Sequence, residues 1–94
     1  MAEKSEMVFD LMRDVFAQHS PTGTDEFDIA PEMEMAFLFQ NDVEIFGNAI
    51  AHFLSEWENQ IGQRGYINVE LEELFNAFKY FNDVYVYFCL ILEV

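Results

Sequence analysis

The first segment of the chain places carboxylates at a regular helical spacing. Glu6, Asp10 and Asp14 are four residues apart, so on a helix they lie one above another along one face. Successive carboxylates are then about 6 Å apart, from the rise of 1.5 Å per residue. A row of negative charges at this spacing resembles, electrostatically, the phosphates of a nucleic-acid strand. The pattern therefore predicts a surface that attracts a positively charged partner.

The acidic residues continue far beyond this segment. From Asp14 to Glu58 the chain carries ten acids and no Lys or Arg, and its 94 residues hold 18 acids against 4 bases, a net charge of −14. Such charge weakens the compact state by self-repulsion, and solubility is normally reached with both signs interspersed. We therefore expect the negative field to be used in recognition. The predicted partner-binding residues are Glu6, Asp10, Asp14, Asp25, Glu26, Asp28, Glu32, Glu34, Asp42 and Glu44.

Residues suited to catalysis are few. His19 and His52 are the only histidines, and His52 is expected to have a structural role. No Ser, Cys or Lys lies in a recognisable nucleophile motif, and no glycine-rich loop is present to hold a phosphate. Four bases are too few to bind an anionic substrate or nucleic acid directly. The sequence therefore predicts no enzyme, no catalytic residue, no cofactor and no direct contact with nucleic acid.

Clustered carboxylates also raise the question of a metal site. Asp25, Glu26 and Asp28, followed by Glu32 and Glu34, offer the oxygen ligands that Ca²⁺ prefers. However, the segment lacks the regular spacing of acids with a glycine and a distal Glu that defines a strong calcium loop. We predict no specific metal.

Three segments have the periodicity of helices that would carry these residues. Residues 3–18 form the first, and residues 41–61 form a second, with Asn41 as cap and Glu44 completing a capping box. Gly62 and Gly65 are expected to end this second helix. A third helix is predicted from Asn68. Its inward side chains would be Val69, Leu71, Leu74, Phe75, Phe78 and Phe81.

Two segments, 31–40 and 83–94, are ambiguous between helix and strand. Residues 33–39 alternate in the manner of a strand, and residues 84–93 are rich in β-branched and aromatic side chains. The predicted fold is mainly α, a single acidic globular domain over residues 1–94 with three to four helices. The alternative is an α+β fold in which 33–39 and 84–93 form a short two-stranded sheet.

Composition also limits the compartment. Cys89 is the only cysteine and cannot form an internal disulfide, which indicates a reducing environment. The start of the chain does not resemble a secretory leader, and the longest nearly apolar run, 84–92, is far shorter than the ~20 residues of a membrane span. We expect a cytoplasmic protein that does not bind membranes.

These observations favour a small inhibitor or antidote that blocks the basic nucleic-acid-binding groove of a nuclease, CRISPR-type effector or toxin. It would act as a nucleic-acid mimic of the anti-CRISPR, anti-restriction or toxin-immunity kind, from a phage or a bacterium. Exposed aromatic side chains are expected to anchor the contact, the candidates being Trp57, Tyr66, Tyr80 and Tyr85. The alternative is a structural or adaptor subunit that self-assembles through its aromatic C-terminal segment. The sequence leaves a homodimer open.

Overall fold

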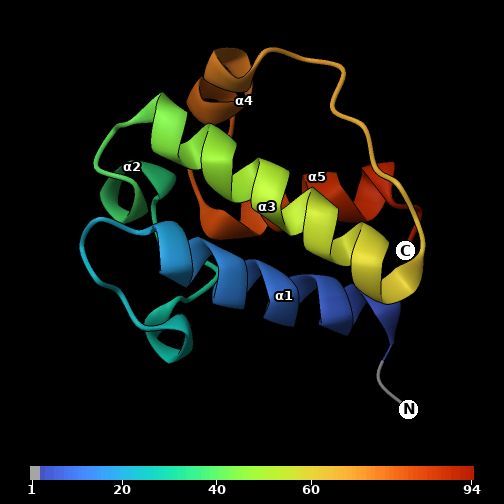
Figure 1. Cartoon of the computed structure of the whole chain (residues 1–94). Helices are drawn as coiled ribbons and strands as arrows, with labels where there is room; N and C mark the ends of the chain where they lie inside the picture. The colour runs from blue at the N-terminus through green and yellow to red at the C-terminus, as the bar shows by residue number, and fades with distance from the viewer. Residues whose placement is uncertain (1–2) are drawn as a thin grey trace.

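The computed structural model describes residues 3–94 and is mainly helical, as predicted (Figure 1). Within these residues there are five α-helices and one short 3-10 helix. The three long helices are α1, α3 and α5, whereas α2 and α4 are short. Their bounds are α1 Lys4–His19, η1 Glu26–Asp28, α2 Met35–Leu38, α3 Val43–Ile61, α4 Leu71–Ala77 and α5 Phe81–Ile91.

The alternative with a two-stranded sheet of 33–39 and 84–93 is wrong, because α2 and α5 occupy these segments. The only β-type pairing among the described residues is one isolated antiparallel bridge between Glu34 and Tyr80. In α5 the buried side chains are Phe81, Val84 and Phe88, at helical spacing. Burial of this stripe against the core outweighs the strand preference of the individual residues, which is weak and depends on context.

The cap of α3 is Asp42, one residue after the predicted cap Asn41. Gln40 and Asn41 are left-handed, with φ of 51° and 59°, so the helix begins only after Asp42. The Asp42 carboxylate accepts hydrogen bonds from the backbone N–H groups of Glu44 (3.0 Å) and Ile45 (3.3 Å). Gly62 ends the helix with φ of 79°, as the sequence predicted.

The predicted third helix is divided into α4 and α5. Asn68 is not its cap, because α4 begins at Leu71 after Glu70. The break at residues 78–80 coincides with the crossing of residues 31–35, where the Met35 N–H donates to Lys79 O (2.9 Å) and the Phe81 N–H donates to Met33 O (2.8 Å). Val69 and Leu71, predicted to point inward, are 43% and 36% exposed.

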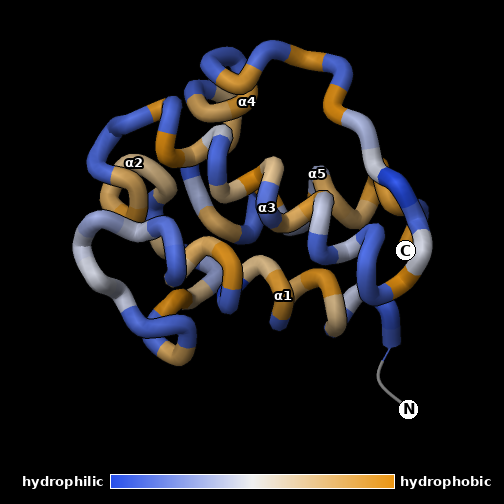
Figure 2. Tube along the Cα trace, in the orientation of Figure 1, coloured by the Kyte–Doolittle hydropathy of each residue, from blue (hydrophilic) through white to orange (hydrophobic). Residues whose placement is uncertain are grey.

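The core is entirely apolar: no polar or charged residue is buried among the described residues. Helices α1 and α3 pack side by side with α5 behind them (Figure 1). Hydrophobic and hydrophilic residues are interspersed along α1 and α3 (Figure 2), as expected for helices with one buried face. Aromatic rings link the layers. The Phe53 ring of α3 stacks on Phe88 of α5, with centroids 4.5 Å apart.

Candidate protein-binding surface

The acidic row on α1 lies on the surface. Glu6, Asp10 and Asp14 are exposed, while Val8, Met12, Val15 and Phe16 form the buried side of the same helix. The 3-10 helix η1, which carries Glu26 and Asp28, packs against α1. The structure therefore brings the first two predicted groups of acids to neighbouring elements.

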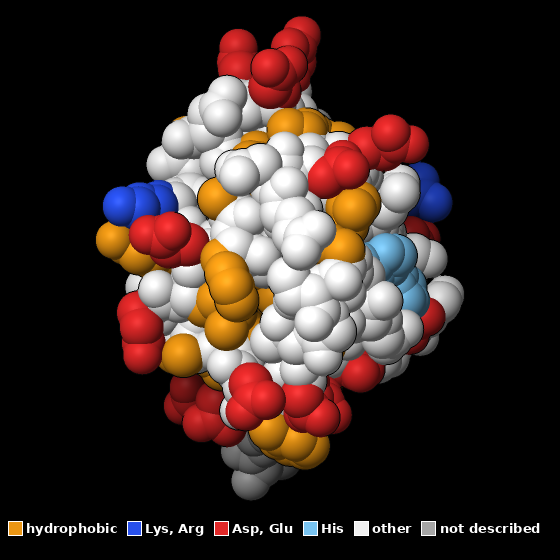
Figure 3. All heavy atoms as spheres, turned by 90° about the vertical axis from the view of Figure 1, so that its left-hand side faces the viewer, with side chains coloured by type: hydrophobic (Ala, Val, Ile, Leu, Met, Phe, Trp, Pro, Cys, Tyr) orange, Lys and Arg blue, Asp and Glu red, His pale blue; other side chains and the backbone are white. Residues whose placement is uncertain are grey.

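The ten predicted acids do not gather into one patch. Glu32 and Glu34 precede α2, and Asp42 and Glu44 lie at the start of α3. On the side of the molecule shown in Figure 3, acidic side chains lie at the top, the bottom and the edges, around a centre that is mostly uncharged. The negative field therefore surrounds this side of the protein.

Five of the ten carboxylates already have partners within the protein. Asp25 accepts a hydrogen bond from the Phe27 N–H (2.9 Å), and Asp42 caps α3. The other three pairs are Asp10 with Arg13 (3.0 Å), Asp14 with Gln18 (3.3 Å) and Glu34 with Lys79 (3.6 Å). Within residues 3–94 the other five form no side-chain hydrogen bond or ion pair: Glu6, Glu26, Asp28, Glu32 and Glu44.

The few bases are mostly paired as well. Arg13 and Lys79 contact acids as described, and Arg64 lies 3.3 Å from Glu58. Hydrogen bonds to Tyr66 and then to Glu58 raise the pKa of Arg64. A hydrogen bond to Tyr80 raises the pKa of Lys79. With three of the four bases paired in this way, the described residues hold no cluster of free bases that would offset the excess of acids.

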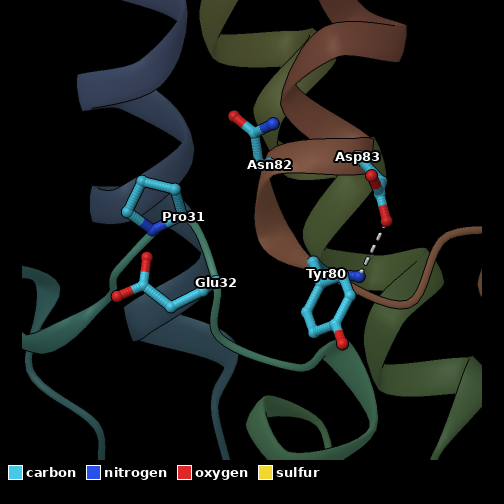
Figure 4. A pocket seen from close by; sticks show the side chains of 5 residues that line it. All are labelled: Pro31, Glu32, Tyr80, Asn82 and Asp83. Carbon is cyan, nitrogen blue, oxygen red and sulfur yellow. Dashed lines mark hydrogen bonds between the residues drawn. The ribbon is translucent and has the colours of Figure 1, made fainter.

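One unpartnered acid, Glu32, lines a hollow where residues 31–32 lie beside the start of α5 (Figure 4). We call this hollow the Tyr80 pocket; it measures about 380 Å³ and is lined by Pro31, Glu32, Tyr80, Asn82 and Asp83. Asp83 accepts a hydrogen bond from the Tyr80 N–H (3.1 Å), which holds the carboxylate against the backbone of Tyr80. Tyr80 itself is 38% exposed, so its side chain is accessible from this hollow.

The lining of the Tyr80 pocket suits a cation. Two carboxylates can accept hydrogen bonds from a guanidinium or an ammonium group. An aromatic face adds a cation–π contact, and the Tyr80 ring already makes one with Lys79, whose Nζ is 5.3 Å from the ring centroid. Neither Lys nor Arg lines the pocket itself.

The predicted aromatic anchors divide into two groups. Trp57 is wrong as an anchor, because it is 1% exposed and donates a hydrogen bond to Gln63 (3.0 Å). Tyr85 is half-buried and donates to the carbonyl of Ser5 (3.1 Å); burial raises its pKa. Tyr66 and Tyr80 are exposed. These latter two remain available to a partner.

Sequence reasoning missed the most exposed aromatic residue. Phe27 is 78% exposed and lies in η1 between Glu26 and Asp28. Phe37 (59%) and Leu90 (72%) are exposed as well. The sequence did contain a signal for Phe27, because it is a single apolar residue between two acids. The segment around it has no helical periodicity that would place its side chain in the core.

The two histidines, far apart in sequence, meet between α1 and α3. His19 Nε2 and His52 Nδ1 are 3.0 Å apart, and the ring centroids are 5.2 Å apart. The two nitrogens thus point at each other in a hydrogen bond and do not converge on an open metal position. Glu56 lies 4.0 Å from the other nitrogen of His52. Burial, and then the neighbouring His52, lowers the pKa of His19.

Other site types find no support in residues 3–94. This part of the chain contains no group of three or more His, Cys, Asp or Glu arranged to hold a metal ion. Its helices are all too short or too polar to cross a bilayer. Comparison with protein-family models, with curated proteins and with solved structures gives no match. Function is therefore inferred from the chemistry of the surface.

Proposed function

We propose that this protein is a small acidic inhibitor that occupies the basic nucleic-acid-binding groove of a nuclease, CRISPR-type effector or toxin. The observation that carries the proposal is that the charged side chains lie outside the core, where the acids greatly outnumber the bases. No charged side chain is buried in residues 3–94, and three of the four bases already contact acids. The net charge of −14 is therefore presented to the surroundings.

Binding would begin with long-range attraction. A strongly negative surface accelerates association with a positive groove, and the effect weakens as salt increases. The row on the outer face of α1 and the acids of η1 provide the extended part of this field. The unpartnered carboxylates can accept charge-assisted hydrogen bonds from the partner without first losing a contact within this protein.

The Tyr80 pocket would add a specific contact to this general attraction. A Lys or Arg side chain from the wall of the groove would enter between Glu32 and Asp83 and lie against the Tyr80 ring. Asp83 is held in place by its hydrogen bond to the Tyr80 backbone, so little ordering is needed on binding. Such preorganisation increases affinity by reducing the entropy lost at the interface.

The test is capture of purified basic nucleases and CRISPR-type effectors on immobilised protein, followed by competition with nucleic acid. We expect binding that weakens with salt and is displaced by the nucleic acid that the partner handles. The variant Asp28→Asn/Glu32→Gln/Glu44→Gln removes three unpartnered carboxylates from η1, the Tyr80 pocket and the start of α3. It should weaken binding by about tenfold or more, since each close charge pair contributes on the order of 1 kcal/mol or more.

A matched control removes the same number of charges elsewhere. Glu3→Gln/Glu72→Gln/Glu93→Gln alters three exposed acids near the two ends of the chain and on α4. It should weaken binding much less than the first variant. Equal, strong binding by both variants, or binding that nucleic acid does not displace, would contradict the proposal.

A second function is favoured by one observation. Val86 and Leu90 on the outer face of α5 are 47% and 72% exposed, which fits a structural or adaptor subunit that self-assembles through its C-terminal segment. However, the rings of Phe81 and Phe88 are fully buried within the protein itself. Light scattering on the isolated protein separates the two functions, because a stable oligomer would favour the structural one.

A further inference from the structure

The division of the predicted third helix creates a second hollow, of a different character from the Tyr80 pocket. It lies between α4 and α5 and measures about 200 Å³. We call it the apolar groove. Its lining residues are Val69, Glu73, Leu74, Ala77, Phe78 and Tyr87, of which Glu73 is the only charged one.

The walls of the apolar groove are ordered by packing. Leu74 is 3% exposed and joins the groove to the core, while Val69 is 43% exposed at its edge. The rings of Phe78 and Tyr87 lie with their centroids 5.4 Å apart, which joins the α4 side to α5. The volume is below the ~300–1,000 Å³ of most small-molecule sites, and it suits one apolar side chain of a partner.

Exposed apolar residues extend the groove along α5. Leu90 follows Tyr87 by three residues and Val86 by four, so the Leu90 side chain is a neighbour of both on the helix surface. Val86 is 47% and Leu90 72% exposed. Large exposed apolar side chains next to an apolar groove are typical of surfaces that receive an amphipathic helix, whose anchors repeat every three to four residues.

Charge decides which kind of partner fits. Glu70 and Glu73 are exposed at the start of α4, beside the groove, and no Lys or Arg lines it. A second copy of this chain would bring another net charge of −14 to the same place, and the repulsion would oppose pairing. A helix with basic residues flanking an apolar stripe meets both the groove and its acidic edge.

We propose that the apolar groove binds a basic amphipathic helix of a partner protein. One large apolar side chain of that helix enters the groove, the next packs on Val86 and Leu90, and flanking Lys or Arg residues contact Glu70 and Glu73. This interaction does not require nucleic-acid mimicry. It would be retained even where the ten predicted acids had no role in binding.

The experiment uses a fluorescent helical peptide with Leu on one face and Lys on the other, and a scrambled peptide of the same composition as probe for charge alone. Fluorescence anisotropy measures binding of each to the full chain. Ala77→Gln fills the groove without a change of charge, and Ala51→Gln makes the same change on the exposed part of α3. Circular dichroism confirms that both variants fold.

We expect the amphipathic peptide to bind about tenfold or more weakly to Ala77→Gln, as for loss of a buried anchor, and unchanged to Ala51→Gln. The scrambled peptide should bind weakly and equally to all three proteins. Loss of discrimination between the peptides, or equal binding to Ala77→Gln, would overturn the proposal. So would a dimer in light scattering that Ala77→Gln dissociates, because the occupant would then be a second copy.

The triple variant Asp28→Asn/Glu32→Gln/Glu44→Gln distinguishes this proposal from the proposed inhibitor function. It should preserve the ratio of affinities for the amphipathic and scrambled peptides, whatever it does to the capture of nucleases. Failure at the apolar groove and failure at the acidic surface are thus observed separately.

Discussion

The inner and outer faces of α1 and α3 differ in almost every chemical property. On the inside, α1 and α3 meet mainly through aliphatic and aromatic side chains, and no polar or charged residue is buried among the described residues. On the outside, the same helices carry Glu6, Asp10, Asp14 and Glu44 at the surface. Stability depends on the first face, whereas the binding that we propose would use the second, so one can be altered while the other is preserved.

The largest expected effect comes from the inner face. Phe53→Ala removes a ring that is fully buried and stacks on Phe88, and should lower the free energy of unfolding by about 3–5 kcal/mol. Urea denaturation followed by circular dichroism measures it. The matched control is Phe27→Ala, which changes a 78% exposed ring and should have an effect of no more than about 0.5 kcal/mol. Equal losses for both would contradict the division into faces.

A smaller loss of stability is expected when the N-terminal cap of α3 is removed. Asp42→Ala removes the side chain that accepts from the Glu44 and Ile45 N–H groups, at a cost of about 0.5–2 kcal/mol. Asp42→Asn removes the same charge but keeps a capping oxygen, and should be close to wild type. If Asn is as destabilising as Ala in thermal denaturation, the carboxylate does not act as a cap.

Removing a charge from the outer face should raise the free energy of unfolding, whereas the changes above lower it. Asp14→Asn relieves a like-charge contact with Asp10 four residues away, and should raise stability by about 0.2–0.5 kcal/mol at low salt. The gain should disappear as salt increases. Glu6→Gln relieves a similar contact but loses a favourable interaction with the N-terminus of α1, so we expect little or no gain from it. A gain for Asp14→Asn that persists at high salt would show that repulsion is not its cause.

The smallest effect concerns the histidine pair between the two helices. Burial lowers the pKa of His19 below its ordinary value of 6.5. The native state therefore takes up this proton less readily than the unfolded chain. The contribution of His19 to the free energy of unfolding is therefore fully present above about pH 6.5 and decreases as the pH falls below that value. The loss ends once the pH is below the lowered folded-state pKa of His19, because the folded and unfolded states then both carry the proton.

The contribution of His19 is measured by comparing wild type with His19→Gln. The difference between their free energies of unfolding is followed from pH 7.5 to 5. Gln retains a group that can hydrogen-bond to His52, which is present in both proteins. We expect wild type to lose stability relative to the variant as the pH falls. Parallel curves would show that His19 does not sense pH through this contact.

Much of the helical structure was predictable from local pattern. The stripe of apolar residues placed α1 within one residue at each end, and Gly62 marked the end of α3. The C-terminal segment was ambiguous, because its β-branched and aromatic residues favour a strand locally while their positions also fit a helix. Only the shared burial of Phe81, Val84 and Phe88 against the core resolves it.

The candidate sites were less predictable. Exposure of the α1 row followed from its spacing, but nothing local indicated that Glu32 and Tyr80, 48 positions apart, line one pocket. Trp57 was misjudged as an anchor because packing in the core leaves it only 1% exposed. Contacts between distant segments decide such questions.

By itself the sequence determined the net charge, the absence of a recognisable catalytic motif and the helical periodicity, because each depends on composition or on neighbours within a few positions. Only the tertiary structure decided where the third predicted helix breaks, which carboxylates are already engaged, and which apolar residues remain outside. For the helix break, the physical reason lies in the backbone hydrogen bonds that residues 31–35 make with residues 79–82. They compete with continuation of the helix, and that competition exists only once the chain has folded back on itself.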